Sequence, residues 1–226
     1  MAQSTQNPSS QQQKVIITNN HGNKLVGILH EAGTKEIVIL CHGLRASKED
    51  IIMTQLTAAL ENAGISSFRF DFTGNGESEG SFEFGNYWRE VDDIHSVAQH
   101  FHEANRRVMA IVGHSKGANV VLLYASKYHD IKTVANLSGR YDLKAGLEDR
   151  LGKDFIERIR KEGFIELKTK SDTIIPVGDA LEFAKILPNH KLHIVKGADH
   201  VYTEHLAELA SIVVNFLKET FAKGRG

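Results

Sequence analysis

Short runs of almost purely aliphatic residues punctuate this chain, and their spacing constrains its fold more than any other feature. The clearest are Glu36–Cys41 (EIVILC) and Val108–Val112 (VMAIV). Such a run is typical of a strand buried on both faces, because a strand with one solvated face alternates apolar and polar residues. Amphipathic stretches at helical spacing separate the runs. This alternation predicts an α/β fold, a mostly parallel sheet with helices on both faces and right-handed crossovers.

The remaining elements are predicted from turn signals and periodicity. A hairpin is expected at Val15–Thr18 and Leu25–His30, around the Gly/Asn turn at 21–23. Further strands are predicted at Ile65–Phe70, Thr133–Leu137 and Leu192–Val195. Helices are predicted at Lys48–Ala63, Asn86–Asn105, through Leu122 and Tyr124, at Asp179–Leu187 and at Glu204–Phe221. In such folds the chemistry lies on loops at the carboxyl ends of the strands.

Length and charge narrow the classes of partner. The 226 residues suit a single domain, which we expect to span 14–226 after a disordered Gln- and Ser-rich tail at 1–13. That start has no apolar core and no arginine, so it resembles neither a signal nor a transit peptide, which favours a cytoplasmic location. The 27 basic residues nearly balance 28 acidic ones. This balance argues against nucleic acid as a partner and favours a small molecule.

Two further observations concern membranes and cysteine chemistry. No stretch is long and apolar enough to span a bilayer. Cys41 is the only cysteine, which excludes an intramolecular disulfide and a cysteine-based zinc cluster. Its place in a buried strand favours an inert thiol over a nucleophile. The sequence leaves the oligomeric state open.

The strand at Val108–Val112 runs directly into Gly113-His114-Ser115-Lys116-Gly117, which fits the pattern G-x-S-x-G. Between a strand and a helix, this pattern predicts a sharp turn with the central residue in strained backbone geometry and glycines where Cβ atoms would clash. Ser115 would then project above the sheet at a helix N-terminus, where the dipole favours negative charge. A plain glycine-rich turn is the alternative, and the strand–helix context disfavours it.

A nucleophilic serine also needs donors for an oxyanion. His42-Gly43-Leu44 directly follows the strand that ends at Cys41. The backbone N–H of Leu44, with that of Lys116 after the nucleophile, is predicted to form a two-donor oxyanion hole. His42 and His114 flank this backbone and are expected to orient it.

Four motifs in this order resemble the α/β-hydrolase superfamily, and within it the serine-aminopeptidase-like (S33-type) branch of esterases and lipases, including small plant members. They are Cys41-His42-Gly43, the D-x-x-G-x-G-x-S-x-G stretch from Asp71 to Gly80, the motif around Ser115, and Gly197-Ala198-Asp199-His200. The resemblance covers nearly all of 14–221. Asp71 and Ser78 are expected to bond local backbone rather than act in catalysis.

In this fold the triad order is Ser, acid, His. His200 lies on the loop after the predicted strand Leu192–Val195, as a general base should. His95, His100 and His102 share one predicted helix and are interpreted as solvated or packing residues rather than metal ligands.

The acid is harder to assign. Asp172 matches the family pattern through Ile174-Ile175-Pro176-Val177 and is favoured, with Asp142, after the strand Thr133–Leu137, as the fallback acid. However, no apolar strand precedes Asp172, and the segment of about 140–170 is shorter by about 40 residues than a cap plus a seventh strand requires. We therefore expect an internal deletion, a reduced lid, and a seventh strand that is missing or replaced. One amphipathic helix is predicted at 153–162, and it is either a lid over the pocket or an ordinary surface helix.

The resemblance implies a serine hydrolase that cleaves carboxylic esters through an acyl-enzyme on Ser115, without metal or cofactor. Two alternatives stay open. One is a non-catalytic ligand binder or inactive shortened isoform, and the other is a serine-aminopeptidase-like peptidase. Substrate, acyl preference and alcohol preference are not fixed by the fold.

Overall fold

The computed structural model describes residues 11–143, 175, 177–187 and 190–223. The chain divides into two compact units. The first combines Met1–Gly139 with His193–Gly226, and the second is Arg140–Leu192. The first unit contains the sheet.

The sheet in the described residues has six strands in the order β1-β2-β4-β3-β5-β6. The β1-β2 hairpin is antiparallel and β2 pairs antiparallel with β4, whereas β4, β3, β5 and β6 run parallel. The predicted mostly parallel sheet is therefore confirmed. The bounds are β1 Gln11–Thr18, β2 Lys24–Glu31, β3 Glu36–Cys41, β4 Ser66–Phe70, β5 Arg107–His114 and β6 Thr133–Leu137.

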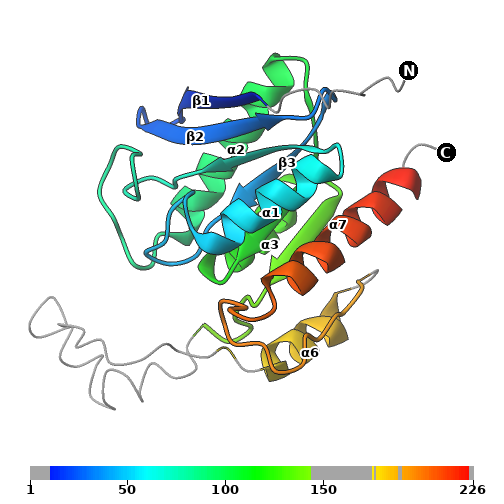
Figure 1. Ribbon diagram of the computed structural model, residues 1–226. Helices are drawn as coiled ribbons and strands as arrows, with labels where there is room; N and C mark the ends of the chain where they lie inside the picture. Colours follow the sequence, from blue (N-terminus) through cyan, green and yellow to red (C-terminus); the bar gives the residue numbers. More distant parts are fainter. Residues whose placement is uncertain (1–10, 144–174, 176, 188–189, 224–226) are drawn as a thin grey trace, which may run out of the picture. The chain divides into compact units, whose positions relative to one another are not determined.

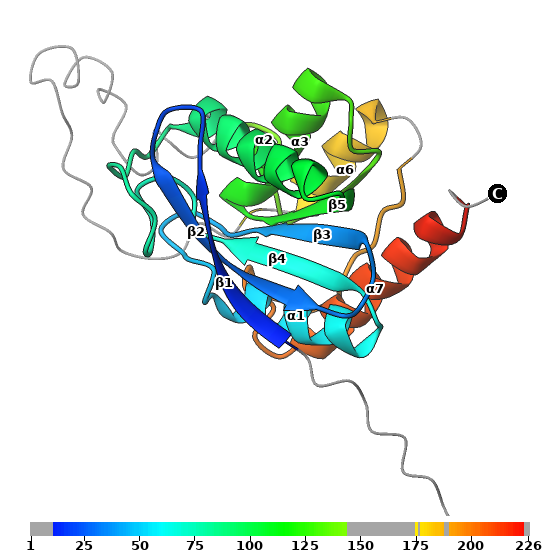
Figure 2. The ribbon, with the colours of Figure 1, turned by 90° about the horizontal axis from the view of Figure 1, so that it is seen from above.

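Helices cover both faces of this sheet (Figures 1 and 2). One face carries α1 (Ile51–Asn62) and α7 (Leu206–Lys223), and the other carries α2 (Tyr87–Glu103) and α3 (Lys116–Tyr128). Alternate residues of β3 show why this strand is apolar throughout: Ile37 and Ile39 pack with α2 and α3, while Val38 and Leu40 pack with α1 and α7. A central strand of a sheet covered on both sides has no solvated face.

Most predicted elements match the observed ones within a few residues, and two differ. Strand β1 starts at Gln11, so the predicted tail of 1–13 loses its last three residues to the hairpin; residues 1–10 lie outside the described part. The predicted strand Leu192–Val195 is not a strand: its residues are exposed or half-buried, with Ile194 53% exposed. An apolar run forms a strand only beside a partner, and the described sheet ends at β6.

The second unit contributes α6 (Val177–Ile186), close to the predicted helix Asp179–Leu187. Within this unit Asp179 accepts a hydrogen bond from the Tyr141 N–H at 2.9 Å. The predicted helix at 153–162 lies outside the described residues. No helix in the described ranges has the length and apolar character needed to cross a membrane.

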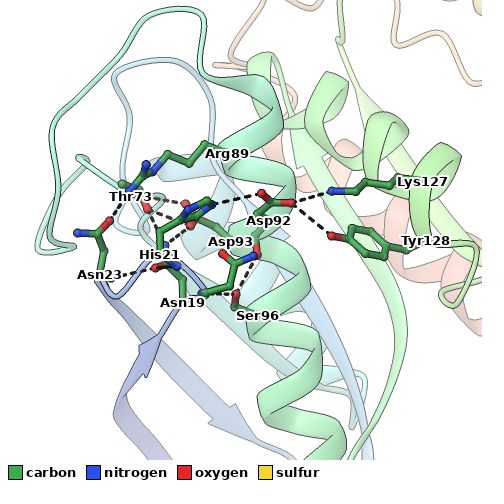
Figure 3. Close-up of polar contacts among 11 residues, drawn as sticks. Asn19, His21, Asn23, Thr73, Arg89, Asp92, Asp93, Ser96, Lys127 and Tyr128 are labelled. Carbon is green, nitrogen blue, oxygen red and sulfur yellow. Dashed lines mark hydrogen bonds and ion pairs between the residues drawn. The ribbon is translucent and has the colours of Figure 1, made fainter.

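Polar contacts to α2 fix the loops that follow β1 and β4 (Figure 3), and those of Asp93 are buried. Asn19 of the hairpin donates to Asp93 of α2 at 2.6 Å, and the same carboxylate accepts the Thr73 N–H at 2.8 Å. The neighbouring Asp92 accepts from Lys127 of α3 at 2.8 Å. The β1-β2 hairpin, the loop after β4 that contains Thr73, and α3 are thus all bonded to α2.

Asp71 performs a similar role at the end of β4. Its buried carboxylate accepts from the Lys48 N–H at 2.7 Å, from Lys48 Nζ at 2.6 Å and from the Glu77 N–H at 2.9 Å. The Ser78 hydroxyl donates to the Asp71 carbonyl at 2.6 Å. The predicted local hydrogen bonds of Asp71 and Ser78 are confirmed. Through Lys48, Asp71 also joins the loop after β4 to the loop after β3.

Asp71→Asn should destabilise the protein by about 3–5 kcal/mol, because it leaves the buried Lys48 ammonium without its buried counter-charge. Urea unfolding measures the loss. Glu77→Gln is the matched control, since Glu77 contacts the same Nζ at 2.7 Å from an exposed position. It should cost far less. Equal losses from the two variants would contradict the importance of the buried pair.

Candidate active site

Ser115 occupies a strained turn between β5 and α3. Its φ of 55° and ψ of −116° lie outside the regions that residues with a side chain ordinarily adopt. The Ser115 N–H donates to the Leu137 carbonyl at the end of β6, at 2.9 Å. The turn is therefore held from a neighbouring strand as well as from its own ends.

The two glycines of the motif permit close backbone contacts. A Cβ on Gly113 would lie 2.3 Å from the Gly117 carbonyl oxygen, and one on Gly117 would lie 2.4 Å from the His42 carbonyl oxygen. Both distances are too short for any side chain. The glycines let α3 begin directly against the end of β3, which is the geometry expected of a nucleophile elbow.

The structure brings Ser115 and His200 together. His200 Nε2 lies 2.9 Å from the Ser115 hydroxyl oxygen, within hydrogen-bond distance. Both side chains are half-buried, so they remain partly open to solvent. A hydroxyl next to an imidazole nitrogen can lose its proton to that nitrogen as it attacks a carbonyl.

His114 and His42 hold the surrounding backbone, as expected from the sequence. His114 Nε2 donates to the His200 carbonyl at 2.9 Å. His42 Nδ1 donates to the Gly43 carbonyl at 2.8 Å, and its Nε2 accepts the Phe72 N–H at 3.1 Å. Burial lowers the pKa of both histidines, to about 4 for His114, so both are neutral at pH 7. They act as fixed hydrogen-bonding groups.

The predicted oxyanion donors follow β3 and Ser115. Leu44 lies in the turn after Gly43, and Lys116 is the first residue of α3, where a helix leaves its N–H groups without an intrahelical acceptor. Gly43 itself is close to the nucleophile, since a Cβ there would lie 3.2 Å from Ser115 Cβ. The loop after β3 and the start of α3 therefore meet beside Ser115.

The side chain of Lys116 forms a buried ion pair that the sequence did not reveal. Its Nζ lies 2.6 Å from Glu90 Oε1 in the first turn of α2, and each side chain is only 5% exposed. The ammonium also lies over the Tyr87 ring, 5.2 Å from its centroid. Burial raises the pKa of Glu90 to about 7, although Lys116 opposes the shift. The signal available in the sequence was an acid, Glu90, at helical spacing with the apolar residues Ile94 and Val97 of a predicted helix.

The acid of the predicted triad is not placed by the described residues. Asp172 lies outside them, and Asp142 belongs to the second unit. Both assignments stay predictions. Within the described ranges no three His, Cys, Asp or Glu side chains gather as metal ligands would. Burial raises the pKa of the Cys41 thiol well above its ordinary value, as for an inert core cysteine.

Sequence reasoning also missed a contact near His200. The hydroxyl oxygens of Ser138 and Tyr202 are 2.7 Å apart. Ser138 directly follows β6, and Tyr202 lies two positions after His200. The only signal was a hydroxyl residue at the carboxyl end of a predicted strand.

Comparison with known proteins gives one family and many similar structures. The family model described as "Serine aminopeptidase, S33" matches residues 32–168. No curated protein matches the chain by sequence. Among solved structures, Est1E from Butyrivibrio proteoclasticus with bound ferulic acid is 22% identical with a TM-score of 0.74, over 92% of this chain and 99% of that one.

Two other solved structures show the same arrangement. The Pyrococcus furiosus esterase Pf2001 is 22% identical with a TM-score of 0.75, over 93% of this chain and 92% of that one. XC6422 from Xanthomonas campestris, described as an a/b serine hydrolase without lid, is 20% identical with a TM-score of 0.67. The match to XC6422 covers 96% of this chain and 95% of that one. At these identities the likeness shows the fold alone.

The buried neutral His114 should make stability fall in acid. With a pKa of about 4 against 6.5 in the unfolded chain, it binds fewer protons when folded between those values. The contribution of His114 to the free energy of unfolding is therefore complete above pH 6.5 and is lost as the pH falls toward 4. Between about pH 7.5 and about pH 5 the loss should be about 2 kcal/mol.

Urea unfolding at the two pH values measures this effect in the wild type and in His114→Gln. The variant should lose less stability on acidification, whereas the exposed control His102→Gln should behave as the wild type. If His114→Gln and wild type lose the same amount, His114 does not carry the effect.

Proposed function

The chain belongs to the serine aminopeptidase S33 family, and from this we propose that it is a serine hydrolase that cleaves small carboxylic esters. It has the α/β-hydrolase fold of the solved esterases that it matches. The observation that carries the proposal is the 2.9 Å contact between the Ser115 hydroxyl and His200 Nε2. That contact lies on the strained turn between β5 and α3.

The proposed reaction assigns each of these groups a step. His200 takes the Ser115 proton as Oγ attacks the ester carbonyl, and the oxyanion is held by the N–H groups of Leu44 and Lys116. His200 then protonates the departing alcohol, which leaves an acyl-enzyme. Water, deprotonated by His200, then attacks the acyl carbonyl, and His200 returns the proton to Ser115 Oγ as the bond from the carbonyl carbon to Oγ breaks and the acid leaves. Each step uses residues of this chain and needs no metal or cofactor.

The acid of the triad is proposed to be Asp172, with Asp142 as the fallback. Its carboxylate would bind the His200 Nδ1–H and stabilise the imidazolium that forms in the transition state. The family motif around Asp172 supports this choice. A shortened lid segment at 140–170 would leave the pocket open and select substrates weakly.

Ester cleavage is favoured over peptide cleavage for two reasons. Two of the solved relatives are esterases or bind ferulic acid, and the sequence identifies no group that would hold a free amino terminus. The aminopeptidase in the family's name nevertheless makes peptide cleavage the second candidate. A cytoplasmic location and a small-molecule partner remain part of the proposal.

A fluorophosphonate probe should label the wild type, because it reacts with a serine that an adjacent base activates. Ser115→Ala should abolish labelling and the turnover of short-chain nitrophenyl esters. Ser126→Ala on α3, a serine exposed away from the elbow, is the matched control and should keep both. Thermal melting of each sample shows that it is folded.

The outcomes separate the candidate functions. A folded wild type without Ser115-dependent labelling would refute the enzyme and favour a ligand binder. Labelling with release of nitroaniline from aminoacyl substrates, but not of nitrophenol from esters, would favour a peptidase. Labelling without either turnover would indicate a failed deacylation step, as in a shortened inactive form.

The assignment of the acid is tested by two variants. Asp172→Asn should lower kcat/KM for a nitrophenyl ester by about 10⁴-fold, since the imidazole loses its correct tautomer. Asp142→Asn should leave it within about twofold of wild type. The opposite ranking would move the acid to Asp142.

A further inference from the structure

The loop that carries His200 has little regular structure to support it. The predicted strand before it is absent, and Ile194 and Val201 are 53% and 41% exposed. Regular structure resumes only at α7, which starts at Leu206. A base that directly follows a strand is positioned by the hydrogen bonds of the sheet ladder. In the described residues no strand directly precedes His200, so no ladder positions it in this way. Other contacts must therefore set the position of His200 against Ser115.

Besides the contact between Ser115 and His200, two hydrogen bonds of the described side chains tie this loop to the ends of β5 and β6. The first is the hydrogen bond from His114 Nε2 to the His200 carbonyl, at 2.9 Å. The second is the 2.7 Å contact between the hydroxyl oxygens of Ser138 and Tyr202. His114 directly precedes Ser115, so the first contact acts from β5. The second acts from the residue that follows β6.

Ser138 directly follows Leu137, the residue whose carbonyl is bonded to Ser115. That carbonyl accepts the Ser115 N–H at 2.9 Å. Tyr202 in turn is two residues from His200, and its carbonyl accepts the His205 N–H at 2.8 Å. The contact between Ser138 and Tyr202 thus links the backbone that fixes Ser115 to the loop that carries His200.

The backbone at both ends of this contact is unusual. Ser138 and Tyr202 have φ values of 54° and 56°, in the left-handed region that favours glycine. Neither is a glycine, so each position pays a conformational cost that surrounding contacts must offset. The Tyr202 ring also packs against the core under α1 and α7 and contacts the His114 ring. A half-buried phenol needs a hydrogen-bond partner, and the Ser138 hydroxyl supplies it.

We propose that Ser138 and Tyr202 are a positioning pair that holds His200 at reacting distance from Ser115, in place of a strand ladder. The proposal rests on the proposed serine-hydrolase function. Neither residue touches the reacting atoms in this arrangement. Each acts through the loop whose geometry sets the distance between Oγ and Nε2.

Tyr202→Phe tests the pair because it removes one oxygen and keeps the packed ring. For a nitrophenyl ester, kcat and the fluorophosphonate labelling rate should both fall by about tenfold, with KM and the melting temperature nearly unchanged. Ser138→Ala should give the same loss, and the double variant should lose no more than either single one. Tyr128→Phe on α3 is the matched control, since it removes a hydroxyl that donates to Asp92 of α2.

The results separate this proposal from the function it rests on. Wild-type labelling that depends on Ser115 establishes the nucleophile independently. If the wild type is labelled and Tyr202→Phe is labelled at the same rate, the positioning role is wrong and the proposed function stands. A lower melting temperature with unchanged kcat would show a purely structural contact and would also overturn it. An unlabelled, folded wild type would overturn both.

Discussion

The rest of the site depends on how closely the backbone of the elbow approaches its neighbours. Gly117 packs against the carbonyl groups of Cys41, the last residue of β3, and of His42 directly after it. The Ser115 N–H donates to the carbonyl of Leu137, the last residue of β6. A residue at φ 55° persists only where such contacts over-determine its geometry. The parallel order β3-β5-β6 supplies these contacts, because it brings the carboxyl ends of three strands to one edge.

Buried charges and neutral histidines then organise the loops at that edge. Asp71 holds Lys48 in the loop after β3, and Glu90 holds Lys116 at the start of α3. Each pair joins two segments that are distant in the sequence, and all four side chains are buried. Removing one partner from such a pair is costly, whereas the pair itself adds little to stability. Their contribution is to the shape of the site, because they fix where the strand-end loops lie.

Hydrophobic periodicity and the context of the motifs were sufficient to predict the central strands and the turn at Ser115. The bounds of β3 and β6 agree with the predicted runs, and the strand–turn–helix around Ser115 follows from its glycines. The predicted strand at Leu192–Val195 failed because an apolar run does not report whether a partner strand lies beside it. The ion pair of Lys116 and the Ser138–Tyr202 contact could not be predicted either, since both join positions that only the tertiary fold brings together.

The Ser115–His200 pair is therefore held in two different ways. Backbone hydrogen bonds between β5 and β6, and the glycine contacts with β3, fix Ser115. The loop that carries His200 is held differently. Its described hydrogen bonds to β5 and to the end of β6 come from the side chains of His114 and Ser138. A backbone ladder survives most substitutions, whereas a side-chain contact is lost with one. The distance between Oγ and Nε2 should thus be most sensitive to the identity of a few residues around the base, and least sensitive to changes elsewhere in the sheet.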